Sequence, residues 1–146
     1  MGILYTQGKA SAEDIFFHLN KCNKDFTPSL DNKVNIQEYA SKIFEKAVTF
    51  EAWDEDILVG LVAAYVNDRG NQVVFITNVS VIETHRGKGI VCNLLKNCIS
   101  HARQNHFKSI ILEVSALNGR AILIYEKAGF QIQGNKNSLL IMKYNI

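Results

Sequence analysis

The segment from Val79 to Ile90 places two glycines and two cationic side chains where an apolar run ends and a helical pattern begins. Gly87 and Gly89 permit positive φ angles and let a bound group approach the backbone closely. The start of a helix presents unpaired N–H groups and a partial positive charge, a combination that most often binds phosphate. Because Arg86 and Lys88 add positive charge, the segment predicts a diphosphate site.

The turn alone does not identify the ligand. A P-loop requires the pattern GxxxxGK followed by Ser or Thr, which is absent here. A dinucleotide fingerprint requires GxGxxG, and Cys92 replaces its third glycine, although Glu113 lies near the distance of a ribose-binding acid. Short glycine turns are common, so a tight strand-to-helix turn without any ligand also stays open.

The elements around this turn predict one α/β domain that covers residues 1–146. Ser11 and Asn35 are typical helix N-caps, each with an acidic residue three positions later. The apolar run from Val73 to Ile82 predicts a central strand buried on both faces. A loop is expected at 23–33. Strands are expected at 3–5, 48–53, 57–66, 73–82, 109–115, 130–133 and 139–144, and helices at 11–22, 35–47, 89–104 and 120–128.

Composition narrows the class of protein. The net charge of +2 comes from scattered basic residues, which argues against a nucleic-acid partner. No apolar run is long enough to span a membrane, and the polar first ten residues do not resemble a signal peptide. The three cysteines have no zinc-site spacing, so we expect reduced thiols, no metal and a cytoplasmic location.

The turn and four features downstream resemble the GNAT family of N-acetyltransferases. The family's diphosphate motif is Gln or Arg, two residues, Gly, one residue, then Gly or Ala, and it corresponds to Arg86-Gly87-Lys88-Gly89-Ile90-Val91. The features that follow at the family's spacing are Leu112-Glu113-Val114 on a strand, Asn118 in a loop, Ala121-Ile122 opening a helix and Tyr125 to Phe130 ending it. The resemblance implies the acyl-CoA N-acyltransferase fold, with a mixed, mostly antiparallel sheet of about seven strands and about four helices, an α+β arrangement.

The resemblance also implies acetyl-CoA as cosubstrate and a primary amine as acceptor. A bulge in the fourth strand of the family exposes backbone groups to the pantetheine arm and the thioester, and Val79, Ser80 and Val81 occupy that place. Asn118 would hold the pantetheine or a linking water. The backbone N–H groups that would bind the diphosphate belong to Gly87, Lys88, Gly89, Ile90, Val91 and Cys92.

The same resemblance provides candidates for proton transfer. Tyr125 would protonate the departing sulfur, and Glu113, or a water molecule, would accept a proton from the amine, with Glu83 as the second candidate. Each residue also has a purely structural interpretation. Tyr125 has the helical spacing of a core tyrosine. Glu113, in an otherwise apolar strand, can be a salt-bridged or edge carboxylate, and Glu83 can be a solvated turn residue.

Val91 departs from the motif because Gly or Ala is usual at its position. A branched side chain there crowds the diphosphate or points into the protein, so a catalytically weak acyl-CoA sensor module is the alternative to an enzyme.

The acceptor is not specified by the sequence. The family resemblance implies that residues 22–35 and 133–140 bind it, whether it is a small amine, an amino sugar, an amino acid or a protein N-terminus. His18 is expected at the surface together with His101 and His106, and Ser80 has no evident His–Asp pair. An exposed last strand would let two chains pair as a homodimer.

Overall fold

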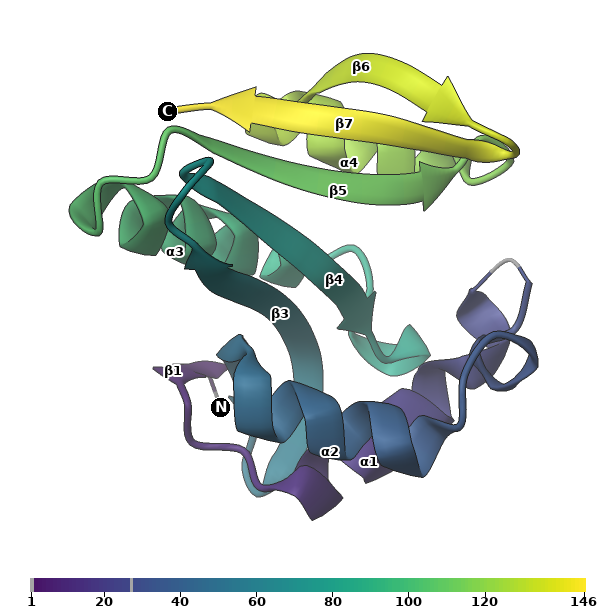
Figure 1. Cartoon of the computed structure of the whole chain (residues 1–146). Coiled ribbons are helices and arrows are strands. Elements are labelled where there is room, and N and C mark those ends of the chain that lie inside the picture. The colour runs from purple at the N-terminus through teal and green to yellow at the C-terminus, as the bar shows by residue number, and fades with distance from the viewer. Residues whose placement is uncertain (1, 27) are drawn as a thin grey trace.

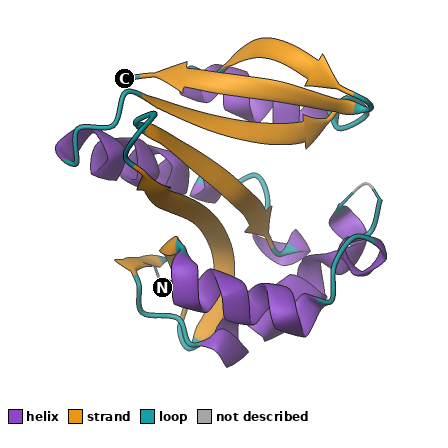
Figure 2. Cartoon of the chain, in the orientation of Figure 1, coloured by secondary structure: helices purple, strands orange, loops and turns teal. Residues whose placement is uncertain are grey.

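The computed structural model describes residues 2–26 and 28–146 and forms one curved sheet with helices on both faces (Figures 1 and 2). Met1, and Thr27 in the predicted loop 23–33, lie outside this description. The predicted order of strands and α-helices is confirmed, with three short 3₁₀ helices added. The elements are β1 (Leu4–Gln7), α1 (Ala12–Cys22), η1 (Asn23–Asp25), η2 (Leu30–Asn32), α2 (Ile36–Lys46), β2 (Val48–Asp54), β3 (Ile57–Asp68), β4 (Val73–Val81), η3 (Glu83–His85), α3 (Ile90–Gln104), β5 (Ser109–Ser115), α4 (Gly119–Ala128), β6 (Gln131–Lys136) and β7 (Leu139–Asn145).

The seven strands follow the order β1-β2-β3-β4-β5-β7-β6. All neighbours are antiparallel except β4 and β5, which run parallel, so the predicted mixed, mostly antiparallel sheet is confirmed. Helices α1 and α2 pack on one face of the β2–β4 region, and α3 packs on the opposite face and contacts α4 (Figure 1). Within residues 2–26 and 28–146, no helix combines the length and the apolar composition needed to cross a membrane.

Local sequence explains where the helices begin and end. The Ser11 side chain accepts from the Asp14 N–H and the Asp14 carboxylate accepts from the Ser11 N–H, so a reciprocal capping box opens α1. Asn35 caps α2 in the predicted place. Helix α4 ends at Gly129, whose φ of 106° is the left-handed conformation expected of a C-cap glycine.

One expectation about the strands holds in part and another is wrong. β4 is the central strand and has buried residues on both faces, but they alternate with half-buried ones, and the strand with a continuous buried stretch is β3. The last strand is not exposed, because β7 lies between β5 and β6 and leaves β6 as the edge. Beyond Ile76, β4 has no neighbouring strand on its β5 side.

The buried carboxylate of Glu51 holds the segment between β1 and α1 against the sheet. Glu51 on β2 is 0% exposed, and its two oxygens accept four hydrogen bonds. The donors are the hydroxyls of Thr6 at 2.7 Å and Thr49 at 2.6 Å and the N–H groups of Lys9 and Ala10 at 2.9 Å each. Four donors replace the water that a carboxylate loses on burial, and they fix the chain where it enters α1.

Candidate functional site

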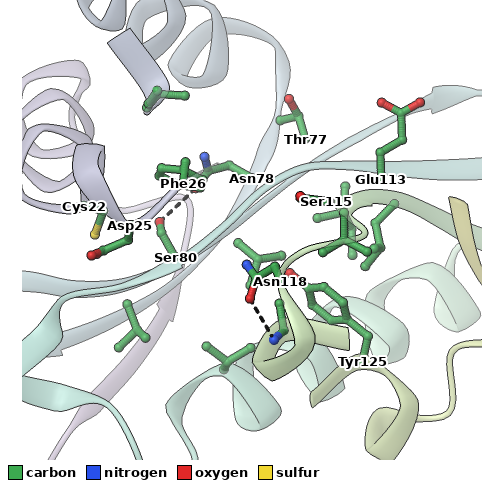
Figure 3. A pocket seen from close by; sticks show the side chains of 18 of the residues that line it. Cys22, Asp25, Phe26, Thr77, Asn78, Ser80, Glu113, Ser115, Asn118 and Tyr125 are labelled. Carbon is green, nitrogen blue, oxygen red and sulfur yellow. Dashed lines mark hydrogen bonds between the residues drawn. The ribbon is translucent and has the colours of Figure 1, made fainter. Parts of the chain in front are cut away.

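A cleft opens in the middle of the sheet where β4 and β5 separate. The two strands pair only from Val73 to Ile76 and from Ser109 to Leu112, although both continue beyond this point. Past the last pair the two strands diverge (Figure 1). A cavity of about 630 Å³ lies between them, and Figure 3 shows side chains that line it. Its walls are the second half of β4, the end of β5, the start of α4 and the segment around η1 and η2.

An extra residue interrupts β4 at the edge of this cleft. Ala63 of β3 pairs with Asn78 and Ala64 pairs with Ile76, so Thr77 has no partner and forms a β-bulge. The family resemblance predicts the bulge at Val79–Val81, and the pairing with β3 places it at Thr77 instead. The reason is that bulge position depends on the pairing register with β3, which the residues of β4 do not reveal by themselves.

The bulge reverses which residues of β4 face each side of the sheet. Ile76 before it and Val79 after it both pack into the cluster under α3, although they are an odd number of residues apart. Asn78 and Ser80 consequently face α1 on the other side, where they are buried and line the cleft (Figure 3). One inserted residue therefore brings two polar side chains to a wall that regular alternation would make apolar.

Helix α2 holds the bulge through one tyrosine. The Tyr39 hydroxyl donates to the Thr77 carbonyl at 2.8 Å and lies 2.8 Å from the Thr77 hydroxyl, which can donate in return. Burial raises the pKa of Tyr39, so the hydroxyl keeps its proton for this contact. The bulge is thus fixed from the side of the cleft that η2 and α2 form.

The glycine turn has the conformation expected of an anion site. Gly87 and Gly89 have φ angles of 76° and 77°, and a Cβ on either would meet no heavy atom within 4 Å. α3 begins at Ile90 with Gly89 as its N-cap, no side chain caps its first N–H groups, and no acidic residue occupies its first turn. Open space, positive φ and uncapped N–H groups together fit a diphosphate.

Neighbouring side chains modify this site. Arg86 lies 2.6 Å from the Asp25 carboxylate of η1, so part of its charge is already neutralised and the pair joins the turn to η1. In the neighbouring residue, His85, the ring atom Nε2 lies 2.7 Å from Asp54 Oδ2. The Val91 side chain is half-buried, packs against the core and also lines the cleft, so both of its predicted positions hold in part.

Tyr125 and Asn118 lie side by side on the α4 wall (Figure 3). Tyr125 is 7% exposed, packs against Phe130 with ring centroids 6.2 Å apart, and lines the cleft. Burial raises its pKa. Asn118 caps α4 by accepting from the Ala121 N–H at 3.2 Å, which leaves its amide N–H₂ for another partner. The core and site interpretations of Tyr125 are therefore compatible.

The two candidate carboxylates are placed differently. Glu113 lies on β5, is exposed, lines the cleft and points away from Tyr125 (Figure 3). It lies just past the last pair between β4 and β5 and pairs only with Ile141 of β7, so its side of β5 is a local edge, as one of its structural interpretations predicted. Glu83 lies on η3, is exposed and is not among the residues that line the cleft, as its solvated-turn interpretation predicted.

The prediction that His18 lies at the surface is wrong. The side chain is 1% exposed and forms hydrogen bonds with Ser80 of β4 and with the Leu58 carbonyl. Burial lowers the pKa of His18 to about 4 and raises the pKa of neighbouring Cys22 to about 12. The sequence carried a signal for this position. His18 lies three residues after Ile15 and four before Cys22, on the same buried stripe of α1.

A family model for the acetyltransferase (GNAT) family matches residues 13–130. The chain belongs to the GNAT family. The GNAT chain is 39% identical over 80 residues to N-acetylaspartate synthetase of Xenopus tropicalis, a match that covers 55% of this chain and 29% of that protein. It is 32% identical over 77 residues to probable N-acetyltransferase family 8 member 5 of Mus musculus, covering 53% and 34% respectively. The GNAT chain thus matches about a third of the length of these curated relatives.

The fold also agrees with solved GNAT structures. The PaiA N-acetyltransferase of Thermoplasma acidophilum, solved in complex with coenzyme A, aligns over 100% of both chains with a TM-score of 0.80 and 16% identity. The ribosomal-protein-S18-alanine N-acetyltransferase of Escherichia coli aligns over 98% of this chain with a TM-score of 0.73 and 18% identity. These likenesses confirm the acyl-CoA N-acyltransferase fold predicted from the GNAT motifs.

Proposed function

We propose that the protein transfers an acetyl group from acetyl-CoA to a primary amine. The observation that carries this proposal is the cleft between β4 and β5, which connects a diphosphate-type helix N-terminus to a buried tyrosine. The N–H groups of 87–92 would hold the diphosphate, Asn118 the pantetheine arm, and backbone groups from Thr77 to Val81 the thioester end. Acetyl-CoA would supply the activated acyl group, and the chain would position the thioester and the amine and transfer the protons.

Two protons must leave a protonated amine during the reaction. A free alkyl ammonium has a pKa near 10, so its first proton must be removed before the nitrogen can attack. Glu113 is the cleft carboxylate on the β5 wall and is our candidate for this step, either directly or through water. Glu83 becomes the weaker candidate because it lies off the cleft.

Tyr125 is proposed to give a proton to the departing thiolate. Its raised pKa keeps the hydroxyl protonated throughout the physiological range, so a donor is present when the carbon–sulfur bond breaks. Burial that disfavours a phenolate also disfavours a thiolate in the same cleft, so the proton transfer is less uphill than the tyrosine pKa alone indicates.

Thiol release from acetyl-CoA across an amine panel tests this function, with Tyr125→Phe as the critical variant. We expect a loss of about 10²-fold in kcat without a change in acetyl-CoA affinity. Tyr144→Phe is the matched control, since Tyr144 packs against the same Phe130 at 5.6 Å but is not among the cleft residues. Equal rates for both variants would exclude the acid role. Tight CoA binding with no turnover of any amine by the wild type would favour the sensor module.

Glu113→Gln tests the base. The rate should fall most at low pH, where most of the amine is protonated and its deprotonation limits the reaction. A pH–rate profile identical to that of the wild type would remove Glu113 from this role.

A further inference from the structure

A buried hydrogen-bonded chain leads from the cleft into the protein behind β4. His18 Nδ1 lies 3.0 Å from the Leu58 carbonyl oxygen and His18 Nε2 lies 2.8 Å from Ser80 Oγ. Ser80 Oγ in turn lies 2.8 Å from Asn78 Oδ1 (Figure 3). Ser80 and Asn78 line the cleft, whereas His18 lies behind them on α1.

The direction of these hydrogen bonds follows from the Leu58 carbonyl. A carbonyl oxygen only accepts, so the proton of the neutral ring must be on Nδ1. Nε2 then carries a lone pair and accepts from the Ser80 hydroxyl. The imidazole is neutral at pH 7 because burial lowers its pKa to about 4.

Ser80 has one proton and two neighbours that both accept. Its hydroxyl can serve Nε2 of His18 or Oδ1 of Asn78, and neither of these atoms donates to the Ser80 oxygen. The neighbouring Cys22 thiol keeps its proton, because burial raises its pKa to about 12, and it is a weak donor to the Ser80 oxygen. A hydroxyl oxygen has two lone pairs, so a second donor can still bind there. The other side of Ser80 is the cleft, and an amine entering the cleft carries N–H donors.

We infer that Ser80 and His18 form a relay that takes the second proton of the acceptor amine. The inference rests on the proposed acetyl transfer. After Glu113 or water has removed the first proton, the nitrogen attacks and a carbon–nitrogen bond forms. The nitrogen becomes far more acidic and gives its proton to Ser80 Oγ, while the Ser80 proton moves to His18 Nε2. The carbon–sulfur bond breaks and the sulfur receives the Tyr125 proton. The imidazolium then returns its proton through Ser80 to the cleft, from which Tyr125 is reprotonated.

In this scheme Ser80 is the catalytic residue and His18 the positioning residue that acts through it. The surroundings of His18 fit a temporary proton acceptor. The charged and titratable groups around it are Lys21 and Cys22 on α1, Asp25 and Arg86 in an ion pair, and Asp14 and Asp56 along the groove on its outer side. Burial and the nearby charge of Lys21 both disfavour the imidazolium, so a ring that takes a proton from Ser80 releases it again readily.

Two substitutions at His18 distinguish a role in accepting a proton from a role in holding the Ser80 side chain in place. Asparagine can keep the donor to Leu58 but does not reach Ser80, and glutamine can present an acceptor to Ser80 but is no base. Cys98→Ala is the control for stability, since Cys98 is a buried thiol of the α3 core. The readouts are kcat, the acetyl-CoA dissociation constant, and the dependence of kcat on the D₂O fraction, which is curved when two protons move together.

We expect His18→Gln and His18→Asn each to lower kcat by about 10²-fold, with unchanged acetyl-CoA affinity and a linear D₂O dependence. Ser80→Ala should behave alike. A wild-type rate for His18→Gln would overturn the relay and leave a placement role. Loss of rate and affinity together, in proportion to stability as in Cys98→Ala, would overturn it as a folding effect. If the wild type binds CoA but acetylates no amine, the proposed function fails and the relay fails with it.

Discussion

The absence of a side chain at Gly60 lets α3 approach the sheet, and Gly60→Ala tests how tightly the diphosphate turn depends on this contact. A Cβ at this position of β3 would lie 2.7 Å from Ile90 Cγ2 and 3.3 Å from both Ala52 Cβ and Leu94 Cδ1. Ile90 is the first residue of α3, and its β-branched side chain has one preferred χ1 in a helix. Rotation therefore cannot relieve the contact, and the helix start itself must move.

The size of the effect follows from this geometry. Carbon atoms prefer separations of about 3.5–4.0 Å, so the start of α3 must shift by roughly 1 Å. Overpacking of this kind costs about 1–3 kcal/mol, which lowers the Tm by roughly 2–4 °C per kcal/mol in a domain of this size. Since the same shift moves the N–H groups that would bind the diphosphate, we expect the CoA dissociation constant to rise about tenfold, or about 1.4 kcal/mol.

Urea unfolding and CoA titration measure the two effects, with Gly134→Ala as the matched control. A Cβ at Gly134 on the edge strand β6 would meet nothing within 4 Å, so stability should change by no more than about 0.5 kcal/mol. If Gly60→Ala is as stable as this control and binds CoA like the wild type, α3 can adjust freely and the reasoning is refuted.

Three further outcomes are expected. Val91→Gly should keep or tighten CoA binding in calorimetry, because it removes a side chain from the cleft, and a large loss would instead show that Val91 is needed for packing. Between pH 6.5 and 4, His18 binds a proton in the unfolded chain but stays neutral in the native chain, because burial lowers its native pKa to about 4. The free energy of unfolding should therefore fall by about 3 kcal/mol as the pH drops from 6.5 to 4. Urea unfolding at several pH values should show this fall in the wild type and lose most of it in His18→Gln. Glu51→Gln should cost about 2–4 kcal/mol, since an amide N–H₂ would face two of its four donors, and hydrogen exchange should rise at Lys9 and Ala10.

Features fixed by neighbouring residues were predictable from the sequence. The caps at Ser11, Asn35 and Gly129 depend on residues a few positions away, and the structure shows them where they were expected. The two glycines of the turn predicted positive φ angles for the same reason. The ordered GNAT motifs then specified a fold that local patterns alone left open.

Features that depend on distant pairing were not predictable in the same way. The bulge at Thr77 is defined by β3, and the contact between Tyr39 and Thr77 joins residues far apart in the chain. The hydrogen-bond partners of His18 and Glu51 are distant in the chain, and only the folded sheet brings them near. Ser80, Asn118 and Tyr125 were therefore named from the sequence, whereas Tyr39, Asn78 and the buried place of His18 were found only in the structure.

The bulge at Thr77 means that β4 is two half-strands in opposite phase. A chimera that exchanges only part of β4 with a regular strand would turn Asn78 and Ser80 toward the apolar cluster under α3 and Val79 toward α1. In the proposed function, the stretch from Thr77 to Gly87 would set the distance between the parts of the chain that hold the thioester and the diphosphate. A chimera should therefore exchange β4 and the glycine turn together, from Val73 through Gly89, and should keep the number of residues between them.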